Sequence, residues 1–423
     1  MVLAPTLTLS AGSGAIVRPT FSRDFAGEKT LNNGTGPAIA FTRASDATYF
    51  DADGVLQTAS SDTPRFDHSG GSSLGLLIEE SRTNSIRNSQ AGGSTNGVIG
   101  SGGVMPTNWV ITANANGITS EIIGTGTEDG LAYIDIKYSG TPTSNGFVYP
   151  TPESATQISA SSGQTWTFST YCKLAAGSLS GATVRIYTAE RASGGANLAN
   201  TAATLTPTTA SLASQRSSVT RTFNNGSTNF ALGIYEIAYT NGNPIDLTLR
   251  IAAPQLEQGA FPTSYIPTTS AAVTRSADSA IVNPISSFYN ASEGTLFAEF
   301  SRYSIAGSGS IFVADNETIG NRVGLFGTVA QVAISDVFTT IDALSVVAGT
   351  VYRGILGYKA NDHAATLNGA AVDTNTAVGV PTAATHLRLG AEAFAGGELS
   401  GHIRRIAYFP KRLSNALLQS LTT

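Results

Sequence analysis

The chain has 423 residues, with 29 acidic residues against 24 basic ones and a formal net charge of −5. This mildly acidic balance argues against nucleic acid as a partner, because nucleic-acid binding needs basic patches that displace counter-ions. The longest apolar stretches fall short of the roughly 18 residues that insertion into a membrane requires. Charged residues make up 13% and glycines number 45, a composition typical of short strands and many turns.

The first region, residues 1–90, is expected to be a small module of strands and turns. Residues 49–56 predict a hairpin with Gly54 at the left-handed position. Residues 74–79, mostly apolar up to Ile78, predict a buried strand. Residues 81–103 are rich in serine, asparagine and glycine, which predicts a linker or a long loop.

The second region, residues 91–270, is expected to be a β-sandwich. Trp166, Phe168 and Thr170 fall on one face of a strand, because side chains alternate along it. Short strands separated by turns stack into two packed sheets. The predicted strands are residues 131–138, 165–171, 184–187, 230–235 and 246–252.

The third region, residues 271–423, is expected to be a second sandwich. Asn368 and Gly369 are a strong hairpin signal. Leu413 and Leu418 have the spacing of a hydrophobic staple around a short C-terminal helix, residues 415–421, that Ser414 can cap. The predicted strands are residues 296–300, 311–313, 353–358, 386–389 and 403–409.

A short sequence echo marks the entrances of two of these regions. The pattern Thr-Arg-Ala-Ser-Asp at residues 42–46 resembles Thr-Arg-Ser-Ala-Asp at residues 274–278. Five residues are too few to establish an internal repeat.

Aromatic side chains in the second region are candidates for carbohydrate contact. Sugar C–H groups pack on flat aromatic faces, while nearby amides and carboxylates bond the hydroxyls. Tyr149 and Tyr239 lie next to turn residues, which supports a surface role as well as a core role. Trp109 is a third candidate, although sealing the domain entrance is the favoured interpretation. Trp166 lies mid-strand beside Phe168, which favours the core.

A polar loop in the third region is a second candidate. Asn361, Asp362 and His363 place an amide, a carboxylate and an imidazole next to one another, where they could orient sugar hydroxyls. A polar hairpin turn is the favoured interpretation.

No cofactor is expected, and a structural calcium ion is left open. Asp51 and Asp53 begin like a calcium loop, but Leu56 and Thr58 are poor ligands, so a plain turn is favoured. Other loop carboxylates could hold calcium: Glu128, Asp129 and Asp315. Cys172 ends a probable core strand and is expected to be a buried structural thiol.

Four segments resemble phage tail-fibre and head-spike proteins. Residues 41–58 look like their N-terminal module, and residues 75–84 are similar to the segment that closes it. Residues 253–268 resemble the last strand of their carbohydrate-binding jelly-roll modules. Residues 401–414 are similar to the end of their concanavalin-A-like (laminin-G-like) domains.

This resemblance implies an all-β protein with a small N-terminal attachment module, a jelly-roll and a concanavalin-A-like sandwich. It implies a virion-surface spike or tail fibre that binds host cell-surface polysaccharide as a homo-oligomer and contacts other virion proteins through its N-terminal module. Two alternatives stay open: a polysaccharide depolymerase, and a purely structural fibre or decoration protein.

No catalytic residues are predicted. Glycosidases need two carboxylates about 5–9 Å apart, and laminarinase-type relatives of the concanavalin-A-like fold carry them as Glu-x-Asp-x-x-Glu. The nearest match, residues 133–138, keeps Asp135 and lacks both glutamates. Carboxylates from separate strands could still meet, so a glycosidase is disfavoured and not excluded.

Overall fold

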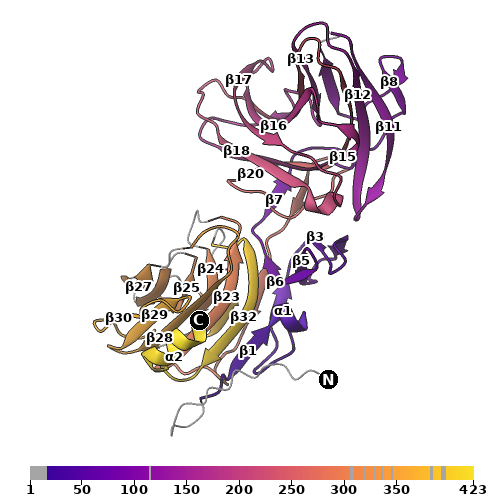
Figure 1. The fold of residues 1–423 in the computed structure, drawn as a ribbon. Coiled ribbons are helices and arrows are strands. Elements are labelled where there is room, and N and C mark those ends of the chain that lie inside the picture. The colour runs from indigo at the N-terminus through magenta and orange to yellow at the C-terminus, as the bar shows by residue number, and fades with distance from the viewer. Residues whose placement is uncertain are drawn as a thin grey trace. The chain divides into compact units, whose positions relative to one another are not determined.

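The computed structural model describes residues 17–113, 116–304, 309–318, 320–327, 329–334, 337–343, 346–381, 384–391 and 397–423 (Figure 1). The regular secondary structure of the described chain is almost entirely strand, which confirms the predicted all-β class. Its helical elements are short: α1 (Phe25–Glu28), the 3₁₀ turn η1 (Leu212–Ser214) and α2 (Asn415–Thr422). Among the described residues, no helix is long and apolar enough to cross a membrane.

The chain divides into two compact units whose boundaries differ from the three consecutive domains expected. The first unit combines residues 1–52, 59–81 and 276–423, and the second combines residues 53–58 and 82–275. The expected N-terminal module, residues 1–90, is therefore shared between the units. The second unit is close to the expected sandwich of residues 91–270.

Two antiparallel sheets build the first unit. The first sheet has the order β30 (Asp373–Asn375), β29 (His363–Leu367), β28 (Tyr352–Lys359), β23 (Glu293–Arg302), β32 (Gly401–Phe409), β6 (Ser72–Ile78) and β5 (Arg65–Ser69), with β1 (Phe21–Asp24) also on β32. The second has the order β2 (Ala40–Thr42), β22 (Ser279–Val282), β31 (His386–Leu389), β24 (Ser310–Asp315), β25 (Arg322–Phe326), β26 (Val329–Ile334) and β27 (Val337–Ala343).

Both faces of β23 are covered in the first unit. Leu296, Ala298 and Phe300 point into the core that the two sheets share. Phe297 points the other way, toward a second cluster that includes Leu413 and Leu418 beside α2. The predicted hydrophobic staple is thus confirmed, and Ser414 stands at the N-cap position without a side-chain capping bond.

The N-terminal strands complete the sheets of the C-terminal sandwich. β1 and β6 pair with successive parts of the same strand, β32, and Figure 1 shows both beside it. β2 pairs with β22 in the other sheet. These pairings join residues more than 200 positions apart, which is why the first 90 residues do not form a module of their own.

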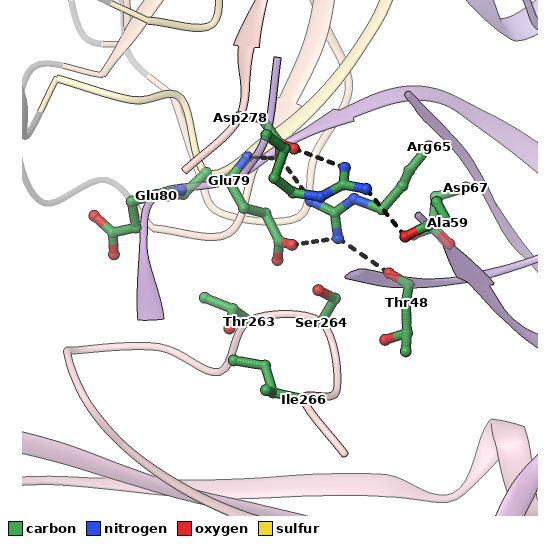
Figure 2. Close-up of polar contacts among 12 residues, drawn as sticks. Thr48, Ala59, Arg65, Asp67, Glu79, Glu80, Thr263, Ser264, Ile266 and Asp278 are labelled. Atoms are coloured by element: carbon green, nitrogen blue, oxygen red, sulfur yellow. Dashed lines mark hydrogen bonds and ion pairs between the residues drawn. The ribbon is translucent and has the colours of Figure 1, made fainter. Parts of the chain in front are cut away.

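A buried ion network lies in the first unit where β5, β6 and the segment before β22 meet. Arg65 donates to Glu79 over 2.8 Å, to Asp278 over 2.6 Å and to the carbonyl of Thr48 (Figure 2). Arg43 donates to the same Asp278 carboxylate over 3.1 Å. All four charged side chains are fully buried, so each charge depends on the others for compensation.

The second unit is a sandwich of two antiparallel-paired sheets, apart from a short parallel β8–β9 pair. One sheet has the order β18 (Arg216–Thr222), β15 (Thr165–Ser178), β20 (Ile245–Gln258), β12 (Leu131–Gly140), β11 (Ile118–Glu128), β8 (Gly97–Ile99) and β9 (Gly102–Gly103). The other has the order β10 (Val110–Ala113), β13 (Gly146–Thr151), β19 (Phe230–Tyr239), β16 (Ala182–Arg191) and β17 (Asn197–Leu205), with β14 (Ile158–Ser159) also on β19.

The core of the second unit lies between these sheets. Trp166 and Phe168 are buried in it, as their mid-strand position predicts. Cys172 is buried there too, as predicted, and burial raises the pKa of its thiol to about 12.

Residues 81–103 do not form the predicted linker. They contain β7 (Arg82–Asn84), which pairs with β21 (Val273–Arg275), and β8, which pairs with β11. Asn88 and Ser89 are buried and fully engaged: the Asn88 amide donates to the carbonyls of Gly92 and Thr107, and Ser89 bonds Tyr265. A polar segment is ordered here because its side chains bond the backbone around them.

The hairpin predicted at residues 49–56 is confirmed. β3 (Ala47–Phe50) and β4 (Leu56–Ala59) pair, and Gly54 has a φ of 75°. Asp51 and Asp53 lie in the turn of this hairpin.

Candidate functional site

A hollow of about 400 Å³ lies on the outer face of the second unit, over β10, β13, β19, β16 and β17. The alternation of side chains along two strands creates it. On β16, Val184 and Ile186 point into the core while Tyr187 and Arg191 line the hollow. The described residues that line it are Val110, Thr112, Tyr149, Thr151, Ser154, Ala155, Tyr187, Arg191, Asn197, Asn200, Leu232 and Ile234.

The floor of the hollow is apolar. Leu232 and Ile234 of β19 pack with Ala189, and all three are buried although they face away from the main core. Tyr149 and Tyr187 pack against this cluster as partly buried rings. A concave apolar floor with aromatic walls is the usual form of a small-ligand site.

Glu236 holds both tyrosines in place. Tyr149 donates its hydroxyl proton to Oε2 over 2.9 Å, and Tyr187 donates to Oε1 over 2.9 Å. Arg185 donates to the same Oε1 over 2.6 Å. Burial, with the neighbouring carboxylate, raises the pKa of Tyr149 and Tyr187, so both keep the proton that they donate. The rings are thereby fixed in orientation before any ligand arrives.

Tyr149 is the predicted candidate that the structure places in this hollow. Tyr239 is 4% exposed and belongs to the core, where it follows Tyr235 and Ile237 on the inner face of β19. Trp109 is 6% exposed, and its Nε1 donates to the carbonyl of Asn88 over 2.8 Å. Tyr239 lies beside a turn but points inward because its strand position faces the core. Trp109 lies just before β10 and takes the structural role that the sequence favours, so neither ring lines the hollow.

The predicted cluster of Asn361, Asp362 and His363 does not converge on one surface. Asn361 has a φ of 59° in the turn between β28 and β29, and Asp362 pairs with Arg412 over 3.1 Å. His363 is fully buried. The three residues form the polar hairpin turn that the sequence favours, and the imidazole offers no face to a ligand.

The buried imidazole of His363 predicts a pH-dependent stability of the first unit. Burial, with Arg412 adding to it and Asp362 opposing it, lowers the pKa of His363 from 6.5 to about 4. The folded state therefore resists a proton that the unfolded state accepts, so the free energy of unfolding falls as the pH drops from 6.5 toward 4. The full loss is about 3 kcal/mol. Urea unfolding at pH 7 and at pH 4.5 measures most of this loss.

The matched control for that measurement is His363→Gln, which removes the titrating group. We expect the variant to show about 2 kcal/mol or more less pH dependence over this interval than the unsubstituted chain. Equal pH dependence in the two proteins would mean that His363 titrates at its ordinary pKa in the folded state.

A smaller hollow of about 290 Å³ lies in the first unit among residues 29–66. Phe41 and Phe66 contribute rings, and Lys29, Asn32 and Asp62 contribute polar groups. Both rings also pack against the core of the first unit. This hollow lacks a carboxylate that fixes aromatic hydroxyls, as Glu236 does in the larger one.

The loop carboxylates considered for calcium are engaged by protein donors. Glu128 accepts from Lys173 and Arg250, and Asp129 accepts from the backbone N–H of Ala213. Asp315 pairs with Arg388 over 2.8 Å. Within the described ranges, no group of three or more His, Cys, Asp or Glu side chains could hold a metal ion.

The sequence argument does not single out Tyr187, Arg191 or Glu236. The signal is present in β16, where Arg185, Tyr187 and Arg191 alternate with Val184 and Ile186. Glu236, by contrast, lies in the apolar stretch of β19, and its role depends on β13 and β16 lying on either side of it.

Comparison with known proteins finds no matching family model and no matching curated protein. Among solved structures, domain 4 of the GH43 extracellular arabinanase AbnA from Geobacillus stearothermophilus, in complex with arabinotriose, has a TM-score of 0.29 at 10% identity and covers 39% of this chain and 81% of its own. The tandem CBM22 modules of Paenibacillus barcinonensis Xyn10C have a TM-score of 0.24 at 11% identity, covering 75% and 98%.

A baseplate protein is also among these structures. The tripod from the baseplate of bacteriophage Tuc2009 has a TM-score of 0.26 at 10% identity and covers 81% of this chain and all of its own. At such TM-scores these likenesses carry no argument about function, which depends on the site itself.

Proposed function

We propose that the second unit binds polysaccharide in the hollow beside Tyr149 and Tyr187. The observation that carries this proposal is the Glu236 carboxylate, which fixes two aromatic rings over an apolar floor. Sugar rings pack their C–H faces on such aromatic walls. The amides of Asn197 and Asn200 line the same hollow and can bond hydroxyls.

Binding without cleavage is the activity that this arrangement supports. Glu236 is engaged on both oxygens by Arg185 and two tyrosine hydroxyls, so it serves to hold the walls. As far as the structure describes the lining, it contains no carboxylate, whereas glycoside hydrolysis uses a pair. We expect the chain length of a bound polysaccharide to be unchanged after incubation, which size-exclusion chromatography measures.

We further propose that this binding serves adsorption of a phage-type particle to host surface polysaccharide. The support is the resemblance of four segments to tail-fibre and head-spike proteins. Single sugar contacts are weak, so several copies on one particle, as a homo-oligomer, would supply avidity. Purified protein added in excess should then compete with particles for adsorption to host cells, whereas a purely structural fibre protein would not.

Tyr149→Ala tests the site directly. The substitution removes one aromatic wall, and we expect the affinity for any bound polysaccharide to fall by about tenfold or more, because central aromatic contacts carry a large share of binding energy. Isothermal titration calorimetry with the polysaccharides that bind on a glycan array measures the change.

Tyr133→Ala is the matched control. Tyr133 lies on β12 in the other sheet of the same unit, half-buried beneath the Arg250 guanidinium. The same ring is lost there without touching the hollow, so affinity should be unchanged. Failure of the unsubstituted chain to bind any glycan, or full affinity in Tyr149→Ala, would contradict the proposal.

A further inference from the structure

The hollow contains one uncompensated positive charge. Arg191 ends β16, and no ion pair to a described carboxylate includes it. Its Nε atom is buried and makes no hydrogen bond with the described residues. Burial lowers the pKa of this guanidinium below its ordinary value, because the charged form loses contact with water.

Other cations of the second unit have described partners, and Arg216, for which no carboxylate partner is described, donates to Ser169 and to the carbonyl of Thr263. Six of them pair with carboxylates at 2.5–3.2 Å: Arg87, Lys137, Lys173, Arg185, Arg221 and Arg250. A half-buried cation without a partner costs free energy, because its charge loses water and gains nothing in return. The one such cation in the described lining of the hollow also points toward the place where a ligand would bind.

The groups that face Arg191 leave its charge uncompensated. Tyr149 interacts with it electrostatically and stays protonated. The Glu236 charge is matched by Arg185. The amides of Asn197 and Asn200 are neutral. The hollow is therefore positive, although the whole chain is acidic.

We propose that the hollow selects a sugar that carries a carboxylate, such as a uronic acid residue of an anionic polysaccharide, with the carboxylate on Arg191. This inference rests on the proposed function and names its ligand class. A planar guanidinium binds a carboxylate through two parallel hydrogen bonds, which fixes the orientation of the sugar as well as its charge. The tyrosine rings then pack against the face of the sugar, and the asparagine amides form hydrogen bonds with its hydroxyls.

The experiment compares acidic sugars with their neutral counterparts on the full chain. Fragments of oligogalacturonate, alginate and hyaluronan are titrated beside the same fragments after reduction of their carboxylates to alcohols. At least one acidic fragment should bind about tenfold or more tightly than its reduced form. A sulfated neutral oligosaccharide of similar length separates recognition of a carboxylate from recognition of charge alone.

Two variants assign the preference to Arg191. Arg191→Met should bring the acidic fragment to the affinity of its reduced form, while the affinity for the reduced form stays within about twofold. Arg191→Lys keeps the charge without the planar fork and should retain part of the preference. Lys137→Met removes an equal charge from β12 in the other sheet and should leave the preference intact.

Each other outcome has a definite meaning. Equal affinity of the unsubstituted chain for acidic and reduced fragments, with both lost in Tyr149→Ala, would overturn the acidic-sugar inference and leave the proposed function standing. A preference that survives Arg191→Met would overturn the role of Arg191. Equal binding of the sulfated probe would overturn the assignment to a carboxylate. Absence of binding to every acidic and neutral probe would count against the proposed function and the inference together.

Discussion

Replacing Asp278 with alanine is expected to lower the free energy of unfolding of the first unit by about 3–5 kcal/mol. The Asp278 carboxylate accepts from Arg43 over 3.1 Å, from Arg65 over 2.6 Å and from the backbone N–H of Glu79 over 2.9 Å. Without it, the buried guanidinium groups of Arg43 and Arg65 both lose a carboxylate that they bind. A buried charge that loses its partner keeps its desolvation penalty, so the loss is large.

The two tryptophans allow the units to be followed separately. Both Trp109 and Trp166 belong to the second unit, so tryptophan fluorescence reports its unfolding while far-UV circular dichroism reports both units. Asp278→Ala should shift the transition seen by circular dichroism and leave the fluorescence transition in place. This separation is needed because a chain of two units need not unfold in one step.

Lys411→Met is the control for Asp278→Ala within the same unit. Lys411 pairs with Glu293 over 3.4 Å, but its side chain is 64% exposed. An ion pair in water contributes about 1 kcal/mol or less, so this variant should unfold almost as the unsubstituted chain does. A loss below about 1 kcal/mol for Asp278→Ala would show that the buried network does not hold the first unit together.

The buried ion network around Asp278 shows what the sequence alone could and could not predict. The echo between residues 42–46 and 274–278 is visible in the sequence, but five residues carry no geometry. In the structure, Arg43 of the first copy pairs with Asp278 of the second, and the backbone N–H of Ser276 donates to Ser45. The two similar segments therefore contact each other, which a comparison of their sequences could not reveal.

Individual strands were predictable because their signal is local. Alternation of apolar and polar residues identifies β12 and β15 from a few neighbouring positions, and the Asn368–Gly369 turn is likewise local. The pairing of β1 and β6 with β32 has no such signal, since nothing in one short strand specifies a partner hundreds of residues away. The expected boundary near residue 90 differs from the two units for that reason.

The binding hollow was only partly predictable for a related reason. Tyr149 could be chosen because Pro150 follows it, yet the same rule selected Tyr239, which faces the core. Tyr239 lies on the same face of β19 as Tyr235 and Ile237, because every second side chain of a strand shares a face. This position was a better guide to its burial than the neighbouring turn. The roles of Arg191 and Glu236 depend on which side chains the neighbouring strands place beside them. The sequence of one strand does not show whether a charged side chain has a counter-ion.

Trp109→Ala is expected to lower the free energy of unfolding of the second unit by about 3–5 kcal/mol, the cost of removing a large buried ring. The indole lies in the core, its centroid 6.4 Å from that of Tyr235, and its Nε1 donates to Asn88 over 2.8 Å. The next residue, Val110, is the one that lines the hollow. Urea unfolding followed by the fluorescence of the remaining Trp166 measures the loss.

Trp109→Phe separates this structural role from a role in binding. The smaller ring keeps most of the packing and loses the hydrogen bond to Asn88, which should cost about 1–3 kcal/mol. Because Trp109 offers no exposed face, the affinity of the folded variant for polysaccharide should equal that of the unsubstituted chain. A tenfold loss of affinity in folded Trp109→Phe, with stability retained, would instead place this ring in the sugar site and move the site away from Tyr149.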